Sequence, residues 1–412
     1  MALHELMHVK PAGLMIEGVA AHQLAQTLGT PLYVYSLGRL RANLRRLRAA
    51  FEPLSQVEIH YSAKANANLS ILRAVLAEGA GIDAVSGGEI FRALSAGADP
   101  RAIVYAGAGK TVEEIAYAVE QGIGWFNVEN LAELGHLERE AARLGRRVRV
   151  ALRLNPEVTA NTHPYIATGH GGAKFGLTSD AIRQALAEQS RYPHLDFMGL
   201  HVHIGSQLGD IGGTVQAVER ALELAAPYES LKTVNIGGGF PVPYGPDEQL
   251  PAFDAFAQAL APLLRGYRVL LEPGRSIVAD IGLLLTRVLY TKYQGGQTIV
   301  IVDASMTELI RPALYGAKHA ILPLSDLSAR GSVQSTQVVG PVCETADVLG
   351  RDVPLPPLHE GDLLAILTSG AYGMVMASHY NARPKPAEVV VEGDTWRVAR
   401  SRERWQDLIA GE

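Results

Sequence analysis

Short apolar segments alternate with amphipathic segments over residues 57–272. The amphipathic segments, such as 69–76 and 215–226, carry apolar residues at three- and four-residue spacing and are typical of helices with one buried face. The short apolar segments predict eight strands, at 57–63, 80–85, 102–107, 123–128, 147–154, 197–203, 232–236 and 267–272. Eight alternations of strand and helix predict an α/β fold, a closed parallel (β/α)8 barrel of the TIM type, which we place at residues 28–278.

An open, doubly wound sheet is the alternative architecture. The regular strand count and the absence of Gly-x-Gly-x-x-Gly after the first strand favour the barrel. After residue 278 the pattern changes to β-rich segments without regular helices, at 281–290, 298–302, 338–339, 363–367 and 388–391. We therefore expect a second, β-rich domain at 279–412 that the N-terminal segment 1–27 completes.

Composition narrows the function classes. The chain has 412 residues, 48% of them hydrophobic and 19% charged, with a formal net charge of −5. This balance offers no basic stripe for nucleic acid, and no apolar run is long enough for a membrane span. The single cysteine, Cys343, fits a reducing, cytoplasmic location. The sequence His4-Glu5-Leu6-Met7-His8 matches a zinc-protease pattern, but Pro11 leaves little helix to carry it, so we expect no metal.

Polar residues occur at the C-terminal ends of five predicted strands, where barrel enzymes have their active sites. Because side chains alternate along a strand, residue parity points these groups into the barrel mouth. They are Lys64, Asp83, Arg153, Asn155, His201, His203 and Glu272. A single inward polar residue is usually a hydrogen-bonded structural group. Several at equivalent strand ends indicate an active site instead.

Two glycine-containing turns follow the last two predicted strands, at Gly237-Gly238-Gly239 and Glu272-Pro273-Gly274-Arg275-Ser276. In barrels, the loops at this place commonly bind phosphate through backbone N–H groups. The amine of Lys64 can form a Schiff base with an aldehyde, and the carboxylate of Glu272 can favour a protonated pyridine nitrogen. His203 can lie against a ring, and Ser206 can bind a phosphate. Together these groups predict pyridoxal 5'-phosphate as the cofactor.

Short motifs along the chain also carry a resemblance to a known family. They are Tyr61-Ser-Ala-Lys-Ala-Asn66, Asp83-Ala-Val-Ser-Gly-Gly-Glu89, Arg153-Leu-Asn-Pro156, Thr162-His-Pro-Tyr-Ile166, Lys174-Phe-Gly176, His201-Val-His-Ile-Gly-Ser-Gln207, Gly237-Gly-Gly239, Glu272-Pro-Gly-Arg-Ser276, Arg311-Pro-Ala-Leu-Tyr-Gly316, Gly340-Pro-Val-Cys-Glu-Thr345 and Ser369-Gly-Ala-Tyr-Gly373. With these motifs nearly the whole chain resembles the barrel-fold (fold type III) pyridoxal-phosphate-dependent amino-acid decarboxylases, and among them most closely the diaminopimelate decarboxylases.

The resemblance implies roles for individual residues. It implies a cofactor site made of Lys64, Asp83, His203, Ser206, Gly237, Gly238, Gly239, Glu272, Pro273, Gly274, Arg275 and Tyr372. It implies three catalytic residues, of which Lys64 carries the cofactor, His203 lies against its ring and Cys343 is the acid that returns a proton to the α-carbon. It also implies an obligatory homodimer with shared active sites, in which the Cys343 and Glu344 pair of one chain completes the site of the other.

The expected substrate follows from the charges at its far end. A distal carboxylate needs a fixed cation, and arginine binds carboxylate as a planar fork. Arg311 and Tyr315 share a face if residues 307–314 form a short helix, while Glu344 can pair with a distal ammonium. The implied substrate residues are Arg275, Arg311, Tyr315, Glu344 and Tyr372.

We therefore expect decarboxylation of meso-2,6-diaminopimelate to L-lysine and CO2, the last step of lysine biosynthesis. The main alternative is a related decarboxylase acting on ornithine, arginine or carboxynorspermidine. A non-catalytic pyridoxal phosphate carrier would not need Cys343, Glu344 and Arg311. An amino-acid racemase would need acid–base groups on both faces of the α-carbon, and the sequence nominates no such pair.

Overall fold

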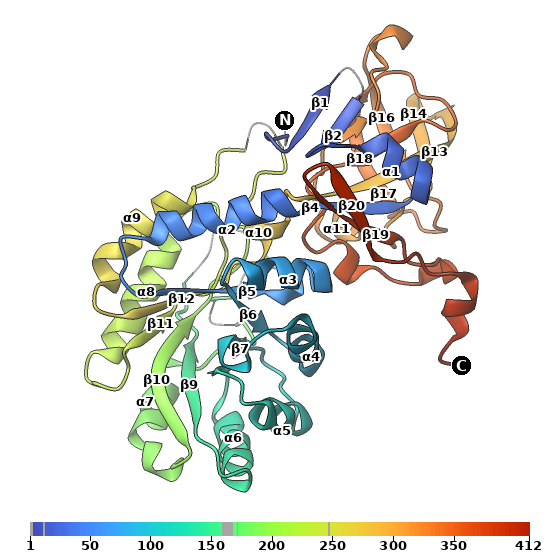
Figure 1. The fold of residues 1–412 in the computed structure, drawn as a ribbon. Coiled ribbons are helices and arrows are strands. Elements are labelled where there is room, and N and C mark those ends of the chain that lie inside the picture. The colour runs from blue at the N-terminus through green and yellow to red at the C-terminus, as the bar shows by residue number, and fades with distance from the viewer. Residues whose placement is uncertain (1–2, 11–12, 159–167, 171, 246–247) are drawn as a thin grey trace. The chain divides into compact units, whose positions relative to one another are not determined.

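The computed structural model describes residues 3–10, 13–158, 168–170, 172–245 and 248–412 (Figure 1). Contacts divide the chain into two compact units. The barrel unit comprises Asn43–Pro241 and Leu250–Ser276, and the β unit comprises Met1–Ala42, Val242–Gln249 and Ile277–Glu412. The motif at residues 162–166 lies outside the described residues.

Eight parallel strands close the barrel unit in the order β10-β11-β12-β5-β6-β7-β8-β9. The strands are β5 (Val57–Ser62), β6 (Gly81–Ala84), β7 (Ile103–Tyr105), β8 (Trp125–Val128), β9 (Val148–Leu154), β10 (Leu195–Val202), β11 (Thr233–Asn235) and β12 (Arg268–Leu271). The barrel closes where β12 pairs with β5, placing Leu270 opposite Glu58. The predicted barrel is confirmed, and each predicted strand boundary lies within two residues of the observed one.

Helices follow the strands and lie outside them, as Figure 1 shows. They are α3 (Leu69–Ala77), α4 (Gly87–Ala96), α5 (Val112–Gln121), α6 (Leu131–Arg143), α7 (Ser179–Ala187), α8 (Gly212–Ala225) and α9 (Phe253–Leu264). Local sequence sets where several of them begin, because a side-chain oxygen accepts a hydrogen bond from a backbone N–H that has no helical partner. Ser86 caps α4 in this way, and Thr111 forms a capping box with Glu114 at α5.

The β unit is built on a nine-stranded sheet with the path β17-β16-β14-β13-β4-β19-β20, in which β18 pairs with β13 and β15. Its strands are β4 (Leu32–Ser36), β13 (Gly282–Gln294), β14 (Gln297–Val302), β15 (Ile321–Pro323), β16 (Gln334–Val339), β17 (Val348–Leu355), β18 (Leu363–Ile366), β19 (Ala387–Glu392) and β20 (Thr395–Arg400). A small sheet of β1 (Met7–Lys10), β2 (Gly13–Ile16) and β3 (Val19–Ala20) precedes α1 (Ala21–Leu28) in the same unit. The expected contribution of the N-terminal segment to the β-rich domain is confirmed.

The N-terminal contribution extends further than the sequence predicted. Residues 28–42 and 242–249 were expected in the barrel, but both belong to the β unit. The reason is β4, which lies between β13 and β19, so that Val34 pairs with Leu283 on one side and Val389 on the other. All five residues of β4 are buried, and a fully buried strand followed by the helix α2 (Leu37–Phe51) has the same pattern as a barrel strand.

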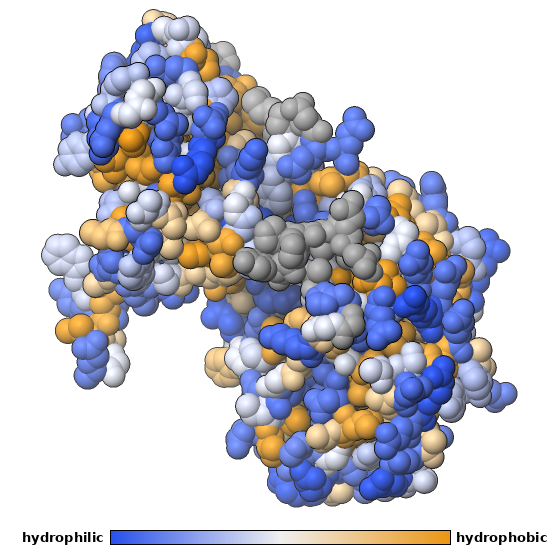
Figure 2. Space-filling view, turned by 180° about the vertical axis from the view of Figure 1, so that it is seen from behind, coloured by the Kyte–Doolittle hydropathy of each residue, from blue (hydrophilic) through white to orange (hydrophobic). Residues whose placement is uncertain are grey.

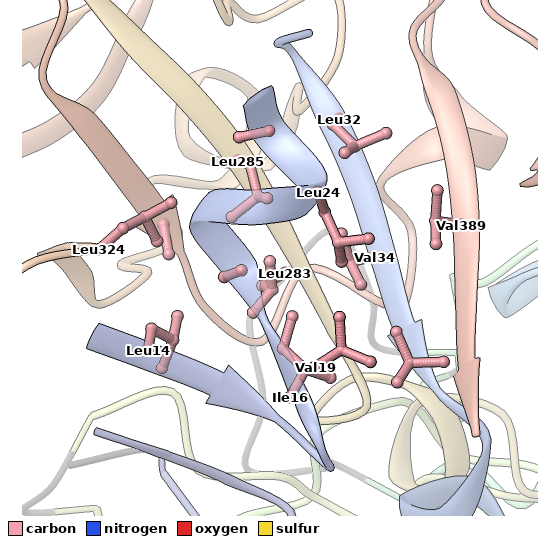
Figure 3. Close-up of a cluster of buried hydrophobic side chains, with 14 of the residues drawn as sticks. Leu14, Ile16, Val19, Leu24, Leu32, Val34, Leu283, Leu285, Leu324 and Val389 are labelled. Atoms are coloured by element: carbon pink, nitrogen blue, oxygen red, sulfur yellow. The ribbon is translucent and has the colours of Figure 1, made fainter. Parts of the chain in front are cut away.

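One apolar cluster fills the space between α1, the N-terminal strands and the large sheet of the β unit (Figure 3). Leu14, Leu24, Val34 and Leu285 are each fully buried in it. Burial of a leucine or valine side chain contributes about 1.5–3 kcal/mol. The cluster therefore fixes the N-terminal segment on the sheet.

The surface mixes polar and apolar residues. On the face drawn in Figure 2, hydrophilic residues alternate with small apolar areas. Within the described ranges, no helix is both long and apolar enough to cross a bilayer.

Candidate active site

Lys64 lies in a single 3-10 turn, Ala63–Ala65, directly after β5. Its Nζ is 3.7 Å from Oδ2 of Asp83, at the end of the neighbouring strand β6. The Lys64 side chain is 39% exposed, whereas that of Asp83 is fully buried. Ser62 Oγ donates a hydrogen bond to the same carboxylate. The amine therefore lies beside a buried carboxylate and is still accessible to solvent and to small molecules.

Glu272 follows β12 and is buried in the barrel. Its Oε1 accepts hydrogen bonds from Asn127 Nδ2 at 2.8 Å and from Asn235 Nδ2 at 2.6 Å, and its Oε2 is 3.3 Å from His201 Nε2. Burial alone would raise the pKa of Glu272, but the charges of His201 and Lys64 and the Asn235 hydrogen bond hold this pKa well below its usual value. Glu272 is therefore ionised at neutral pH.

The pKa of Asp83 is shifted in the opposite direction, upward. Burial and repulsion by Glu272 raise the pKa of Asp83, although Lys64 and the Ser62 hydrogen bond oppose the change. Two carboxyl groups with pKa values pushed apart are typical of acid–base sites. In this pair the pKa of Glu272 is lowered and the pKa of Asp83 is raised, and Asp83 is the carboxyl group beside the Lys64 amine.

His203 follows β10 and faces the Gly237–Gly239 turn. The backbone N–H of Gly238 donates to His203 Nδ1 at 3.2 Å, so a neutral imidazole carries its proton on Nε2. Burial and the charge of Arg153 lower the pKa of His203 well below its usual value. His203 thus presents a neutral ring at the barrel mouth, which is compatible with its predicted position against the cofactor ring.

The turn itself needs glycine. Gly237 and Gly239 have φ values of 68° and 93°, in the left-handed region that disfavours other residues. A Cβ on Gly238 would lie 2.3 Å from the carbonyl oxygen of Glu272. Positive φ therefore explains Gly237 and Gly239, and close backbone approach explains Gly238.

Arg275 is buried directly after β12. Its Nε and Nη2 each lie 3.2 Å from Ser206 Oγ and donate to it. A Cβ on the preceding Gly274 would come within 3.0 Å of Ser62 Cβ. The barrel unit therefore combines a guanidinium, a hydroxyl and a glycine turn beside the strand ends, and this donor set suits a phosphate.

These residues fit pyridoxal 5'-phosphate. The cofactor requires an accessible amine, an anion for its pyridine nitrogen and donors for its phosphate. Lys64, the ionised Glu272 and the pair of Arg275 with Ser206 supply these groups from strand ends of one barrel. Buried oxygens without a partner among the described residues, Asp83 Oδ1 and Asn127 Oδ1, are further sites for a bound polar molecule.

The β unit holds the predicted residues Arg311, Tyr315, Cys343, Glu344 and Tyr372. Arg311 is buried, with its guanidinium carbon 4.3 Å from the ring centre of Tyr244 and its Nη1 2.9 Å from Nε2 of His319. His319 Nδ1 lies 2.9 Å from the carbonyl oxygen of Leu367 and donates to it. Arg311 therefore has one fixed orientation.

The predicted position of the short helix, residues 307–314, is wrong. The observed helix, α11, is Arg311–Tyr315, with Pro312 in its first turn. A helix running through Pro312 would set the proline ring against the carbonyl of Glu308, which instead accepts a hydrogen bond from Tyr33. Arg311 and Tyr315 still share one short helix.

Cys343 is exposed, and its backbone N–H donates to Asn381 Oδ1 at 3.1 Å. Glu344 accepts a hydrogen bond from Tyr380 at 3.3 Å. Tyr372 has a φ of 54°, a strained value for a non-glycine residue that is common at functional sites. The assigned roles of these three residues stay predictions.

Several polar groups were missed in the sequence. Asn127 and Asn235 donate hydrogen bonds to Glu272, and Glu129 pairs with Arg153, a residue that the strand parity had pointed into the mouth. The two asparagines lie at the ends of β8 and β11, so the parity rule that selected Glu272 could also have found them. Tyr244 and His319 had no such signal, because neither lies at the end of a barrel strand.

Glu89 gives a pH-dependent prediction. Burial raises the pKa of Glu89 from 4.5 to about 7, and Asp83 adds to the effect. The folded state therefore binds this proton more tightly than the unfolded state, and stability is lost as pH rises from 4.5 to 7. We expect Glu89→Gln to raise the free energy of unfolding at pH 8 by on the order of 2 kcal/mol, less than the full shift because some solvent contact remains.

Denaturant unfolding at pH 5 and pH 8 checks this expectation. The gain from Glu89→Gln should be much smaller at pH 5, because the folded wild type is already protonated there. Glu113→Gln, on an exposed residue of α5, is the matched control. An equal gain at both pH values would contradict the assignment.

The chain is similar to known proteins over nearly its whole length. The family model described as "pyridoxal-dependent decarboxylase, pyridoxal binding domain" matches residues 37–279. The diaminopimelate decarboxylase of Aquifex aeolicus is 42% identical over 405 residues, 96% of this chain and 94% of the relative. The crystal structure of the Helicobacter pylori diaminopimelate decarboxylase complexed with L-lysine has a TM-score of 0.89 at 40% identity, covering 94% of this chain and 98% of that one.

A third similarity comes from a more distant sequence. The diaminopimelate decarboxylase structure from M. jannaschii has a TM-score of 0.92 at 36% identity and covers 99% of this chain and 98% of that one. The likeness thus extends over both units. The chain belongs to the pyridoxal-dependent decarboxylases and, within them, to the diaminopimelate decarboxylase family.

Proposed function

We propose that this protein decarboxylates meso-2,6-diaminopimelate to L-lysine and CO2 with pyridoxal 5'-phosphate. The observation that carries the proposal is the ionised Glu272 in the same barrel mouth as the Lys64 and Asp83 pair. When bound, the cofactor supplies an electron sink for the pair left on the α-carbon as CO2 departs. The chain supplies the groups that hold the cofactor, orient the substrate and return a proton to the α-carbon.

Each barrel residue has a physical task. Lys64 binds the cofactor, and its amine lies 3.7 Å from Asp83, whose pKa is raised by burial. Glu272 remains an anion and favours a protonated pyridine nitrogen. Arg275 and Ser206 hold the phosphate together with Gly237, Gly238 and Gly239, while Pro273 and Gly274 shape the adjoining turn.

Arg311 is our candidate for the distal carboxylate of the substrate. The ring of Tyr244 and the hydrogen bond to His319 fix its guanidinium, which lowers the entropy lost when a carboxylate binds. Ornithine and lysine offer no anion to Arg311, so they should bind weakly. In the H. pylori relative the bound molecule is L-lysine, and we infer that lysine is the product here.

A comparison of substrates tests this function. The protein is loaded with pyridoxal 5'-phosphate and given meso-diaminopimelate, ornithine, arginine or lysine separately, and CO2 release is measured. We expect meso-diaminopimelate to be preferred by kcat/KM. Preference for an amino acid without a distal carboxylate would exclude the assignment.

His319 should affect substrate binding through Arg311. We expect His319→Ala to raise KM for meso-diaminopimelate about tenfold, because a hydrogen bond to a charged group contributes about 1.5 kcal/mol, while kcat changes less. His319→Gln offers an amide oxygen to Arg311 and should recover most of the affinity. Lys318→Ala changes an exposed neighbour and serves as the control. A fall in kcat with KM unchanged would assign His319 a different role.

We also propose that Cys343 returns the proton to the α-carbon, across a homodimer interface. Cys343→Ala should lower kcat by roughly 100-fold, within the range for a missing general acid. An exposed thiol in this role requires a reducing compartment, which supports a cytoplasmic location.

Mixing two inactive variants tests the shared site. Lys64→Ala and Cys343→Ala, co-expressed, form heterodimers with one site that has both residues. Random pairing should restore roughly a quarter of wild-type activity. If both residues act within one chain, the mixture will be no more active than Cys343→Ala alone.

A further inference from the structure

A cavity of about 890 Å³ opens at the N-terminal ends of the barrel strands, the end opposite the candidate active site. Its wall includes the first residues of β5 and β12 and the last turns of α2. The volume lies in the range of small-molecule sites, roughly 300–1,000 Å³. None of the residues assigned to the decarboxylase site lines it.

Arginines dominate the charged wall. Arg45, Arg48, Arg101, Arg149 and Arg268 line the cavity, against the acids Glu52, Glu58 and Asp99. Three of the arginines have carboxylate partners: Arg268 pairs with Glu58 at 2.5 Å, Arg101 with Asp99 at 2.8 Å and Arg45 with Glu78 at 2.8 Å. The wall therefore keeps an excess of positive charge after these pairs are counted.

Arg149 carries part of this unpaired positive charge. Its guanidinium carbon lies 5.1 Å from the ring centre of Trp125, and that of Arg268 lies 5.5 Å from the same ring. Within the described part of the chain, the Arg149 guanidinium has no hydrogen bond or ion pair. Burial and repulsion by Arg268 lower the pKa of Arg149. An anion between the two guanidiniums would relieve this repulsion.

His60 gives an independent indication of a ligand. Its side chain is 4% exposed, and its Nδ1 donates to the carbonyl oxygen of Ala102 at 3.1 Å. Its Nε2 is 3.5 Å from Glu58 Oε2 and has no hydrogen-bond partner in the described ranges. The buried Nε of Arg268 also lacks one there. In the tautomer with the proton on Nδ1, Nε2 can accept a hydrogen bond from a ligand hydroxyl.

We propose that this cavity is a second ligand site, for a small oxyanion that also carries a hydroxyl group. Arg149 and Arg268 bind the carboxylate or phosphate, and His60 Nε2 accepts from the hydroxyl. Phe51, Leu54 and Ile59 form an apolar part of the same wall. Phosphate esters and hydroxycarboxylic acids both combine an anionic group with a hydroxyl. The proposed site lies at the opposite end of the barrel from the candidate active site.

Calorimetric titration of the holoenzyme tests the proposal, since bound cofactor already occupies the phosphate cradle of the active site. Glycerol 3-phosphate, L-malate and neutral glycerol are titrated separately. We expect saturable binding of at least one anion and none of glycerol. Arg149→Gln should weaken the binding by about tenfold or more, the loss expected for hydrogen bonds to a charged group. The tighter of the two anions identifies the ligand class.

Arg147→Gln is the matched control, because Arg147 precedes the same strand but pairs with Asp196 and does not line the cavity. It should leave binding unchanged, and Arg149→Gln should leave decarboxylation in the absence of anion unchanged. Arg149→Lys keeps the positive charge but lacks the planar guanidinium, so this variant should bind the anion with intermediate affinity. It also tests the contribution of Arg149 in a second folded variant. Equal binding by the wild type and Arg149→Gln, or no saturation with either anion, would overturn the proposal.

Discussion

Lys64→Ala should lower kcat for meso-diaminopimelate by roughly 10⁴-fold, at the upper end of the range for removing a group that moves a proton. The loss is expected to be large because Lys64, 3.7 Å from Asp83, is the residue that we propose holds the cofactor. CO2 release under saturating substrate and cofactor gives kcat directly. Lys232→Ala changes an exposed lysine of the same unit and should remain fully active.

A folding defect must be separated from a chemical one. Lys64 is partly exposed and lies in a single turn, so its replacement should leave the circular dichroism spectrum unchanged. A Lys64→Ala variant that keeps more than a tenth of wild-type kcat would show that another lysine holds the cofactor.

Glu272→Gln should lower kcat by roughly 10³-fold, as expected when a preorganised electrostatic group is removed from a buried site. A neutral amide cannot favour a protonated pyridine nitrogen, and its NH2 group would compete with the donors Asn127 and Asn235. The cofactor should still bind, because Arg275 and Ser206 remain. Both kcat and the amount of bound cofactor are measured for the variant. Glu223→Gln, on the exposed face of α8, is the control.

The pH profile provides a second check on Glu272. Its pKa lies well below the usual value, so the carboxylate is present from neutral pH downward and no loss of activity should come from its protonation at about pH 5. Glu272→Asp keeps the charge on a shorter side chain and should retain more activity than Glu272→Gln. Equal activity of Glu272→Gln and wild type would remove Glu272 from the proposed site.

Much of the barrel could be predicted from the sequence, because its signals are local. Each strand is a short apolar segment beside an amphipathic helix, and strand parity alone pointed Lys64, Asp83 and Glu272 to one mouth. The structure confirms the barrel and places Lys64 beside Asp83. The partners of Glu272, Asn127 and Asn235, follow the same rule but were not selected, although Asn155 was.

Other features depend on contacts between distant segments. Residues 28–42 were expected in the barrel domain without a strand of their own, and only the pairing of β4 with β13 and β19 assigns them to the β unit. The orientation of Arg311 depends on Tyr244, His319 and Leu367, which no local pattern connects. The cavity lined by Arg149 and Arg268 likewise exists only once the barrel has closed. These features arise from tertiary packing, so a local sequence pattern could not reveal them.

The most direct test of the account is to find where the cofactor is attached. Borohydride fixes the bond between a lysine amine and an aldehyde, so the holoenzyme is reduced, digested and mapped by mass spectrometry. We predict a pyridoxyl phosphate label on Lys64, and its absence from that position in the Lys64→Ala variant. A label on another lysine in the wild type, or no stable label at all, would contradict the assignment of Lys64 as the residue that holds the cofactor.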